Sequence, residues 1–112
     1  MGYVYILGDW EKEGYYKIGV TRGSVEKRIK KLQTGNSGEI YLVNKFETKH
    51  PFLMENMLHQ WYAGKRVKGE WFELSSEDVI NFRTNCEKIE GIFDVMKDNY
   101  FFKKTYENGA TD

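Results

Sequence analysis

The chain has little of what many functional sites are built from. Its 112 residues include one cysteine, one proline and two histidines. The lone Cys86 cannot form an internal disulfide, and no Cys/His spacing suggests zinc. No apolar run approaches the length of a membrane span, and the N-terminus lacks a signal pattern. These absences predict a reduced cytoplasmic protein with no membrane partner.

The chain also has no excess of charge of either sign, because 17 basic residues balance 17 acidic ones. The distribution along the chain is uneven, however. Residues 1–69 carry 12 Lys and Arg against 7 Asp and Glu, and residues 70–112 carry 5 against 10. Such asymmetry between halves is a pointer to a surface that faces nucleic acid.

What the chain does have is aromatic side chains, at 16%, within a hydrophobic content of 40%. This composition predicts one packed domain. Two Tyr-rich runs, Tyr3–Leu7 and Tyr15–Thr21, alternate as strands do and flank a charged insert, which predicts an antiparallel hairpin. Ser24 offers a helix N-cap, the apolar stripe Val25, Ile29 and Leu32 follows it, and the remaining faces of this helix are basic. Gly35 is expected to end it.

The second half of the chain continues the alternation of strands and helices. Ile40–Thr48 is predicted as a third strand, and a helix over 51–62 begins at a proline. That helix is expected to turn Met54, Leu58, Trp61 and Tyr62 towards the core. A basic loop over 64–69 precedes a short strand at Trp71–Leu74, whose Trp71 and Phe72 are assigned to the core. Ser75 and Asp78 have capping-box spacing before a helix over 77–89 that Gly91 ends.

The predicted fold class is α+β. It has a small central three-stranded mixed or antiparallel sheet flanked by helices, in the order ββαβα, with extra C-terminal helices. Residues 1–90 are predicted to form the main domain and residues 91–107 a helical extension packed on it. Residues 108–112 are expected to be a disordered tail.

Five segments in this order carry a resemblance. They are Gly2-Tyr3-Val4-Tyr5, Lys17-Ile18-Gly19, the basic helix with Arg28, the segment Leu53–His59 with Glu55, and Gly69-Glu70-Trp71-Phe72. As an ordered set they resemble the GIY-YIG nuclease superfamily, within its small viral and phage-type subgroup (T5orf172- and MUG113-like domains) whose second motif begins with lysine. Lys17 stands where the superfamily has a tyrosine. The neighbouring Tyr16 points to the opposite face of the strand and cannot replace it.

The resemblance implies a metal-dependent DNA endonuclease of phage or viral type, working inside a cell. Glu55 would be the ligand of a single Mg²⁺ (or Mn²⁺) ion, which keeps several waters and takes phosphate oxygens as further ligands. Tyr5 would be the general base, favoured as phenolate by the cations Lys17 and Arg28. His59 is included among the catalytic residues. Contacts to substrate are expected from Arg28, which matches phosphate bidentately, and from Lys31, Lys65 and Arg66.

Each of these residues also has a structural interpretation. Tyr5 could be a packed strand tyrosine and Lys17 a solvated one, and Arg28 could extend a basic face. Glu55 and His59 could form an ordinary pair one helical turn apart. Glu70 could be a turn carboxylate that pairs with Lys68.

Two other functions remain open at this level. A catalytically weak or inactive relative would bind nucleic acid only, in a salt-dependent way. A protein-interaction domain would instead use the aromatic segment Tyr100-Phe101-Phe102 against a partner chain. A homodimer is compatible with any of the three.

Overall fold

A computed structural model describes residues 1–96. Its five strands form one sheet in the order β3-β1-β2-β5-β4, and every neighbouring pair is antiparallel. The strands are β1 (Gly2–Asp9), β2 (Tyr15–Thr21), β3 (Ile40–Thr48), β4 (Arg66–Lys68) and β5 (Trp71–Glu73). The α+β class is confirmed, but the prediction of a three-stranded sheet was wrong, because β4 and β5 extend the sheet beyond β2.

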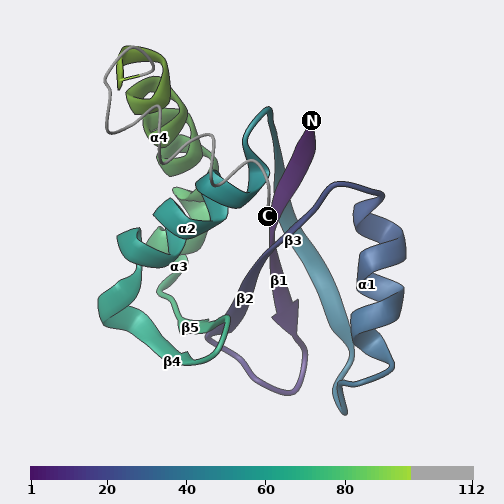
Figure 1. The fold of residues 1–112 in the computed structure, drawn as a ribbon. Coiled ribbons are helices and arrows are strands. Elements are labelled where there is room, and N and C mark those ends of the chain that lie inside the picture. Colours follow the sequence, from purple (N-terminus) through teal and green to yellow (C-terminus); the bar gives the residue numbers. More distant parts are fainter. Residues whose placement is uncertain (97–112) are drawn as a thin grey trace.

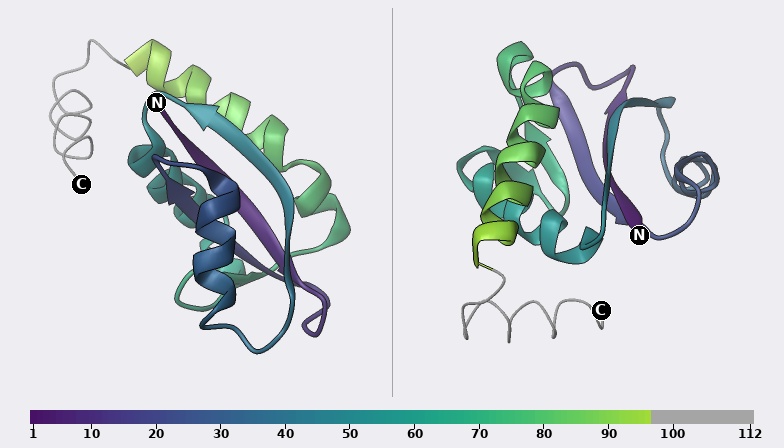
Figure 2. Two further views of the ribbon diagram at one scale, coloured as in Figure 1. Left: turned by 90° about the vertical axis from the view of Figure 1, so that its right-hand side faces the viewer. Right: turned by 90° about the horizontal axis from the view of Figure 1, so that it is seen from above.

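The helices cover the sheet unequally. Helix α1 (Val25–Gln33) lies alone on one face, while α2 (Pro51–Trp61), α3 (Ser76–Ile80) and α4 (Phe82–Met96) lie on the other (Figures 1 and 2). We call these the α1 face and the α2 face. None of the helices in residues 1–96 has the length and apolar character needed to cross a membrane.

Each face has its own apolar core, and alternation along β1 divides its residues between them. Val4 and Ile6 face α2 and α4, where they pack with Ile18 and Phe72 in the larger core. Tyr5 and Leu7 point the other way and pack with Val25 and Ile40 beneath α1. Because successive strand side chains point to opposite faces, one strand supplies both cores.

The beginning of α1 follows its predicted capping. The Ser24 side chain accepts a hydrogen bond from the backbone N–H of Lys27, as an N-cap should. The helix ends at Gln33 with Thr34 as its C-cap in a right-handed conformation, so Gly35 does not supply the stop. The predicted bounds of β3 and the proline start of α2 are confirmed.

The basic segment predicted as a loop over 64–69 is partly ordered into regular structure. A short 3-10 helix, η1 (Ala63–Lys65), leads into β4, which turns back into β5 at Gly69. Gly69 has a φ of +56°, a conformation that suits glycine and allows this tight reversal. Three residues are too few to show strand periodicity, so β4 gave no signal in the sequence.

The C-terminal helical region departs from prediction in its breaks. The capping box of Ser75 and Asp78 is confirmed, but it begins the short α3, which ends before Asn81. A second helix, α4, then runs through Gly91 instead of ending there. Trp61 was expected in the core, yet 45% of it is exposed, because it is the last residue of α2. The predicted tail at 108–112 and the segment Tyr100–Phe102 lie outside the described residues.

Candidate active site

Tyr5 lies at the centre of the α1 face, opposite Gly19. The two residues are Cα partners across the β1–β2 hairpin. A Cβ atom built on Gly19 would lie 2.5 Å from the Tyr5 hydroxyl oxygen, so the tyrosine ring crosses directly over this glycine. Only glycine leaves room for that path, which turns the phenol towards the edge of β2.

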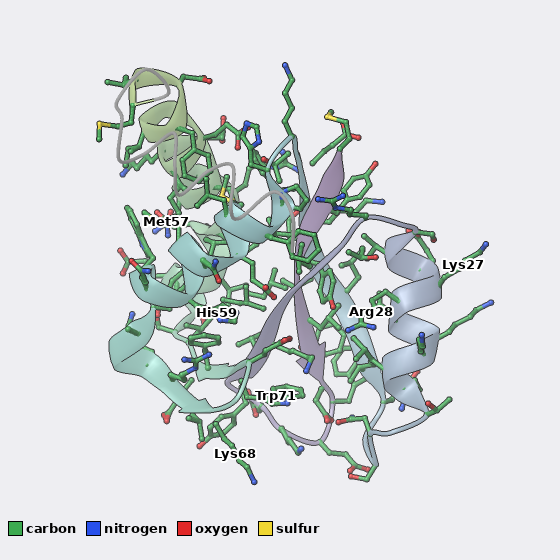
Figure 3. All side chains as sticks on the ribbon, in the orientation of Figure 1. Lys27, Arg28, Met57, His59, Lys68 and Trp71 are labelled. Atoms are coloured by element: carbon green, nitrogen blue, oxygen red, sulfur yellow. The ribbon has the colours of Figure 1, made fainter. Side chains whose placement is uncertain are left out.

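Arg28 reaches the Tyr5 hydroxyl from α1. Its Nε donates to the Tyr5 Oη across 3.4 Å. In Figure 3, Arg28 points from α1 towards the sheet whereas the adjacent Lys27 points away from it. Burial raises the pKa of Tyr5 above its usual value, and the hydrogen bond and charge of Arg28 oppose this without cancelling it. Arg28 therefore favours the phenolate as predicted, but burial keeps Tyr5 protonated in the resting protein.

Lys17 lies on the same face, as strand alternation predicted. It is the Cα partner of Leu7 on one side and of Trp71 on the other. Its ammonium lies 3.6 Å from a Glu70 carboxylate oxygen. Glu70 therefore pairs with Lys17 and not with Lys68, the partner considered from the sequence. The pair is only partly exposed, with 20% of the Lys17 side chain and 37% of the Glu70 side chain accessible.

His59 attaches α2 to the edge of β2. The ring atom Nε2 lies 3.0 Å from the carbonyl oxygen of Ile18, and Nδ1 lies 3.3 Å from Nη2 of Arg66. A carbonyl only accepts and a guanidinium only donates, so in this arrangement Nε2 donates to Ile18 and Nδ1 accepts from Arg66. Both ring nitrogens are thus occupied, which excludes the simple Glu55–His59 pair weighed from the sequence.

These contacts close a ring of hydrogen bonds around the point where β5 begins. The Ile18 N–H donates to the Glu70 carbonyl at 3.1 Å, and the Arg66 Nε donates to the Gly69 carbonyl at 2.6 Å. His59 joins Ile18 to Arg66 and completes the circuit. The ring fixes α2 and the β4–β5 turn to the one residue that separates Lys17 from Gly19.

Glu55 lies one helical turn before His59, on the same side of α2. It is partly buried, and its carboxylate forms no hydrogen bond or salt bridge with the described residues. Burial, and secondly the negative charge of Glu70, raise the pKa of Glu55 to about 7, while Lys17 and Arg28 lower it. The Glu55 carboxylate therefore shares the electrostatic environment of the two cations and the second carboxylate.

The donor set fits a hard divalent cation with few protein ligands. Residues 1–96 contain no group of three or more His, Cys, Asp or Glu side chains that could hold a metal ion. Mg²⁺ does not require one, since it binds through one or two carboxylates and completes its shell with water and phosphate. A partly buried carboxylate without a hydrogen-bond partner, with its pKa raised, is the type of group that a bound cation would stabilise.

The predicted substrate contacts separate into two groups. Arg28 lies at the site, and the exposed Lys31 lines an adjacent cleft of about 300 Å³ together with Lys17. Lys65 instead forms a salt bridge of 2.6 Å with Asp78, at the start of α3. Arg66 is engaged by His59 and the Gly69 carbonyl. The structure thus brings Arg28 and Lys31 to the site face and gives Lys65 and Arg66 structural partners.

Comparison with known proteins adds a family to this geometry. The family model of the T5orf172 domain matches residues 2–87. The chain belongs to the T5orf172 domain family. No curated protein and no solved structure matches it. The match indicates a nuclease-like or nucleic-acid-binding module, and every residue of the site described above lies within the matched span of this T5orf172 domain.

Sequence reasoning missed Glu70 as a member of the site of the T5orf172 domain. Its signal was present, because Glu70 stands between the glycine of a turn and a strand that pairs with β2 at Lys17. Trp71 was assigned to the core, but only Phe72 is fully buried there, while Trp71 is partly exposed. Trp71 is the Cα partner of Lys17 and therefore belongs to the α1 face.

Proposed function

We propose that this T5orf172 domain is a metal-dependent endonuclease that hydrolyses phosphodiester bonds in DNA, of GIY-YIG type and with a single Mg²⁺ or Mn²⁺ ion. One observation carries the proposal. Arg28, Glu55 and Glu70 act electrostatically on the Tyr5 hydroxyl, and Lys17 acts on Glu55 and pairs with Glu70. Perturbed titratable groups that converge in this way are typical of catalytic sites.

The cations suit the phosphate of a substrate. Arg28 uses Nε for the Tyr5 hydroxyl, which leaves its terminal nitrogens to donate to phosphate oxygens. Lys17 is held by Glu70 at the same face and adds a second positive charge to that phosphate. Together they would stabilise the negative charge that develops when water attacks the phosphorus.

Glu55 would hold the divalent ion, which supplies Lewis-acid stabilisation of the phosphate and of the leaving oxygen when bound. Tyr5 would receive the proton of the attacking water at Oη. Because burial keeps that hydroxyl protonated at rest, Tyr5 must first release its own proton to solvent water, and the positive charge of Arg28 favours this release. His59 has a positioning contact through the Ile18 carbonyl, and a direct catalytic role for it stays a prediction.

Purified protein incubated with supercoiled plasmid and Mg²⁺, and separately with Mn²⁺, tests this function. We expect nicked or linear DNA from the wild type, and its loss in Glu55→Gln, Tyr5→Phe and Arg28→Ala. The exposed helix residue Lys27, which points away from the sheet, offers the matched control Lys27→Ala with wild-type cleavage (Figure 3).

A second function is favoured by one observation, the protonated resting state of Tyr5 beside a lysine in the second motif. A domain that cannot generate the phenolate would bind DNA without cleaving it. Intact plasmid under all metal conditions, together with a salt-sensitive gel shift that Arg28→Ala weakens, would replace the endonuclease with this binding module.

A further inference from the structure

Helix α1 covers only part of its face of the sheet, and the remainder presents a row of side chains. The Cα partnerships run from Leu7 to Lys17, from Lys17 to Trp71, and from Trp71 to Lys68. Partners directly opposite each other in antiparallel strands point to the same face. Leu7 is buried beneath α1, so the row leaves the covered core and continues as Lys17 and Trp71 on the open half. Lys68 follows across a register shift in β4 and lines a cleft together with Trp71.

Trp71 is the centre of this open half. The ammonium of Lys17 lies 5.8 Å from the centroid of its ring, and that of Lys12, from the β1–β2 loop, lies 5.2 Å from it. Figure 3 shows Arg28, Trp71 and Lys68 presented by three different elements, α1, β5 and β4. Ammonium groups from β2 and from the β1–β2 loop thus flank this indole.

Two clefts meet at Trp71 and differ in charge. The cleft of about 300 Å³ on the α1 side has Lys17 and Lys31 as its charged lining residues. The cleft of about 530 Å³ on the other side lies between the β1–β2 loop and the β4–β5 hairpin, and it combines Trp71 and Tyr15 with the lysines Lys12 and Lys68 and the acidic Glu11 and Glu13. The first cleft suits a phosphate, whereas the acidic residues of the second disfavour one and leave its aromatic walls for a base.

The loop that forms one wall of the larger cleft is fixed in place at both ends. Asp9 accepts hydrogen bonds from the Glu11 N–H at 2.8 Å and from the Asn36 amide at 2.9 Å. At the other end, the Leu74 N–H donates to the Gly14 carbonyl at 3.0 Å, which joins the loop to the end of β5. Lys12 is thus held above Trp71 by the fold.

We propose that Trp71 is a stacking platform for an unpaired nucleotide of the substrate strand, with its base in the larger cleft and the neighbouring phosphate at Lys17 and Lys31. Aromatic side chains between cations are the usual means of binding single-stranded nucleic acid, because every base offers a face for stacking. The inference rests on the proposed function, because it takes the phosphate next to this nucleotide as the one that is cleaved. It makes single-stranded or locally opened DNA the preferred substrate.

Binding of a short single-stranded oligonucleotide to the Glu55→Gln protein, which cannot complete cleavage, tests the platform apart from catalysis. A matched oligonucleotide with abasic sites keeps the phosphates and removes the bases. We expect Trp71→Leu to lower the affinity for the intact strand about tenfold and to leave the affinity for the abasic strand unchanged. Trp10→Leu is the control, because Trp10 is exposed and stacks on Tyr41, outside the row.

A fluorescence measurement makes the test independent of how Trp71→Leu folds. Trp10 and Trp61 are both exposed and can be replaced by phenylalanine, which leaves Trp71 as the sole tryptophan. Quenching of its emission by the intact strand and not by the abasic strand supports stacking. The inference is overturned if Trp71→Leu lowers the affinity for the intact and the abasic strand equally. It is also overturned if the emission of Trp71 does not change when the intact strand binds.

The outcomes also separate this inference from the proposed function. Cleavage of plasmid with normal binding by Trp71→Leu would leave the endonuclease standing and remove the platform. If binding depends on the bases and on Trp71 but the wild type never cleaves DNA, the stacking platform is supported and the endonuclease proposal is rejected.

Discussion

The two faces of the sheet are made from the same strands and do different work. The α2 face is closed and apolar, with Val4, Ile6, Ile18 and Phe72 buried against α2 and α4. The α1 face has a small core that includes the buried Tyr5, and it then opens into Lys17, Trp71 and their charged neighbours. Trp71 and Phe72 are neighbours in sequence, yet Trp71 lies on the face of the candidate site and Phe72 lies in the larger core. The comparison indicates that stability and chemistry are separated residue by residue, by strand alternation.

The largest change in stability should come from the closed face. Phe72 is fully buried and its ring packs against His59 and Tyr62. Phe72→Ala should lower the free energy of unfolding by about 3–5 kcal/mol, because it leaves a cavity in the larger core. The adjacent Trp71→Ala should cost much less. Urea unfolding of both variants measures the difference, and equal losses would contradict the division into two faces.

A small substitution at Gly19 should disturb the α1 face, because the Tyr5 ring crosses over this glycine. The added methyl group of Gly19→Ala would meet the Tyr5 hydroxyl, so the ring must leave its position beside Arg28. We expect a loss of about 1–3 kcal/mol in unfolding free energy. The rate of cleavage should fall on the order of 100-fold, since a misplacement of a catalytic group by about 1 Å can have an effect of this size.

Gly91→Ala is the matched control for that experiment. Gly91 lies inside α4, where an added Cβ would meet no atom within 4 Å. Alanine is the better helix former by about 1 kcal/mol, so this variant should be slightly more stable and fully active. Normal cleavage by Gly19→Ala would show that the path of Tyr5 across the glycine is irrelevant to function.

The face of the sheet on which a strand residue lies was predictable from the sequence, but the contacts between separate elements were not. Alternation and capping residues were sufficient for the β1–β2 hairpin, α1, β3 and α2, and they placed Tyr5 and Lys17 together. The contact of His59 with Ile18 depends on where β5 stops pairing with β2, a tertiary fact without a local pattern. The same holds for the pairing of Glu70 with Lys17.

The break between α3 and α4 shows a different limit. The capping box at Ser75 marked the beginning of a helix but carried no information on its length. Gly91 was interpreted as a stop because glycine is a poor helix former. Packing of Ile89 and Phe93 in the larger core outweighs that cost and carries α4 through it.

The pH dependence of stability should distinguish the faces more finely. The folded protein keeps a proton on Glu55 up to about pH 7, whereas the ordinary value for an accessible glutamate is 4.5. Ionisation between these values therefore destabilises the fold, so the wild type should lose stability relative to Glu55→Gln as pH rises through this window. Below 4.5 the difference should disappear.

Thermal melting of both proteins across that window, with and without Mg²⁺, measures this effect. A cation bound at Glu55 should restore stability to the wild type above pH 7 and leave Glu55→Gln unchanged. Glu73→Gln, which replaces an exposed carboxylate on β5, should keep the wild-type behaviour. Parallel curves for wild type and Glu55→Gln at every pH would remove Glu55 from the metal site.

The smallest effect should come from a lysine that the sequence placed among the substrate contacts. Lys65 is paired with Asp78, and half of its side chain is exposed. Lys65→Met should change the unfolding free energy by less than about 1 kcal/mol and leave DNA affinity and its salt dependence unaltered. Lys31→Met removes a charge from the cleft beside Lys17 and should reduce the salt slope of binding by about one. Titrations at several salt concentrations compare the two variants directly. If Lys65→Met lowered the slope as much as Lys31→Met, the DNA path would extend over the β4–β5 hairpin to α3, and the open half of the α1 face would be only part of it.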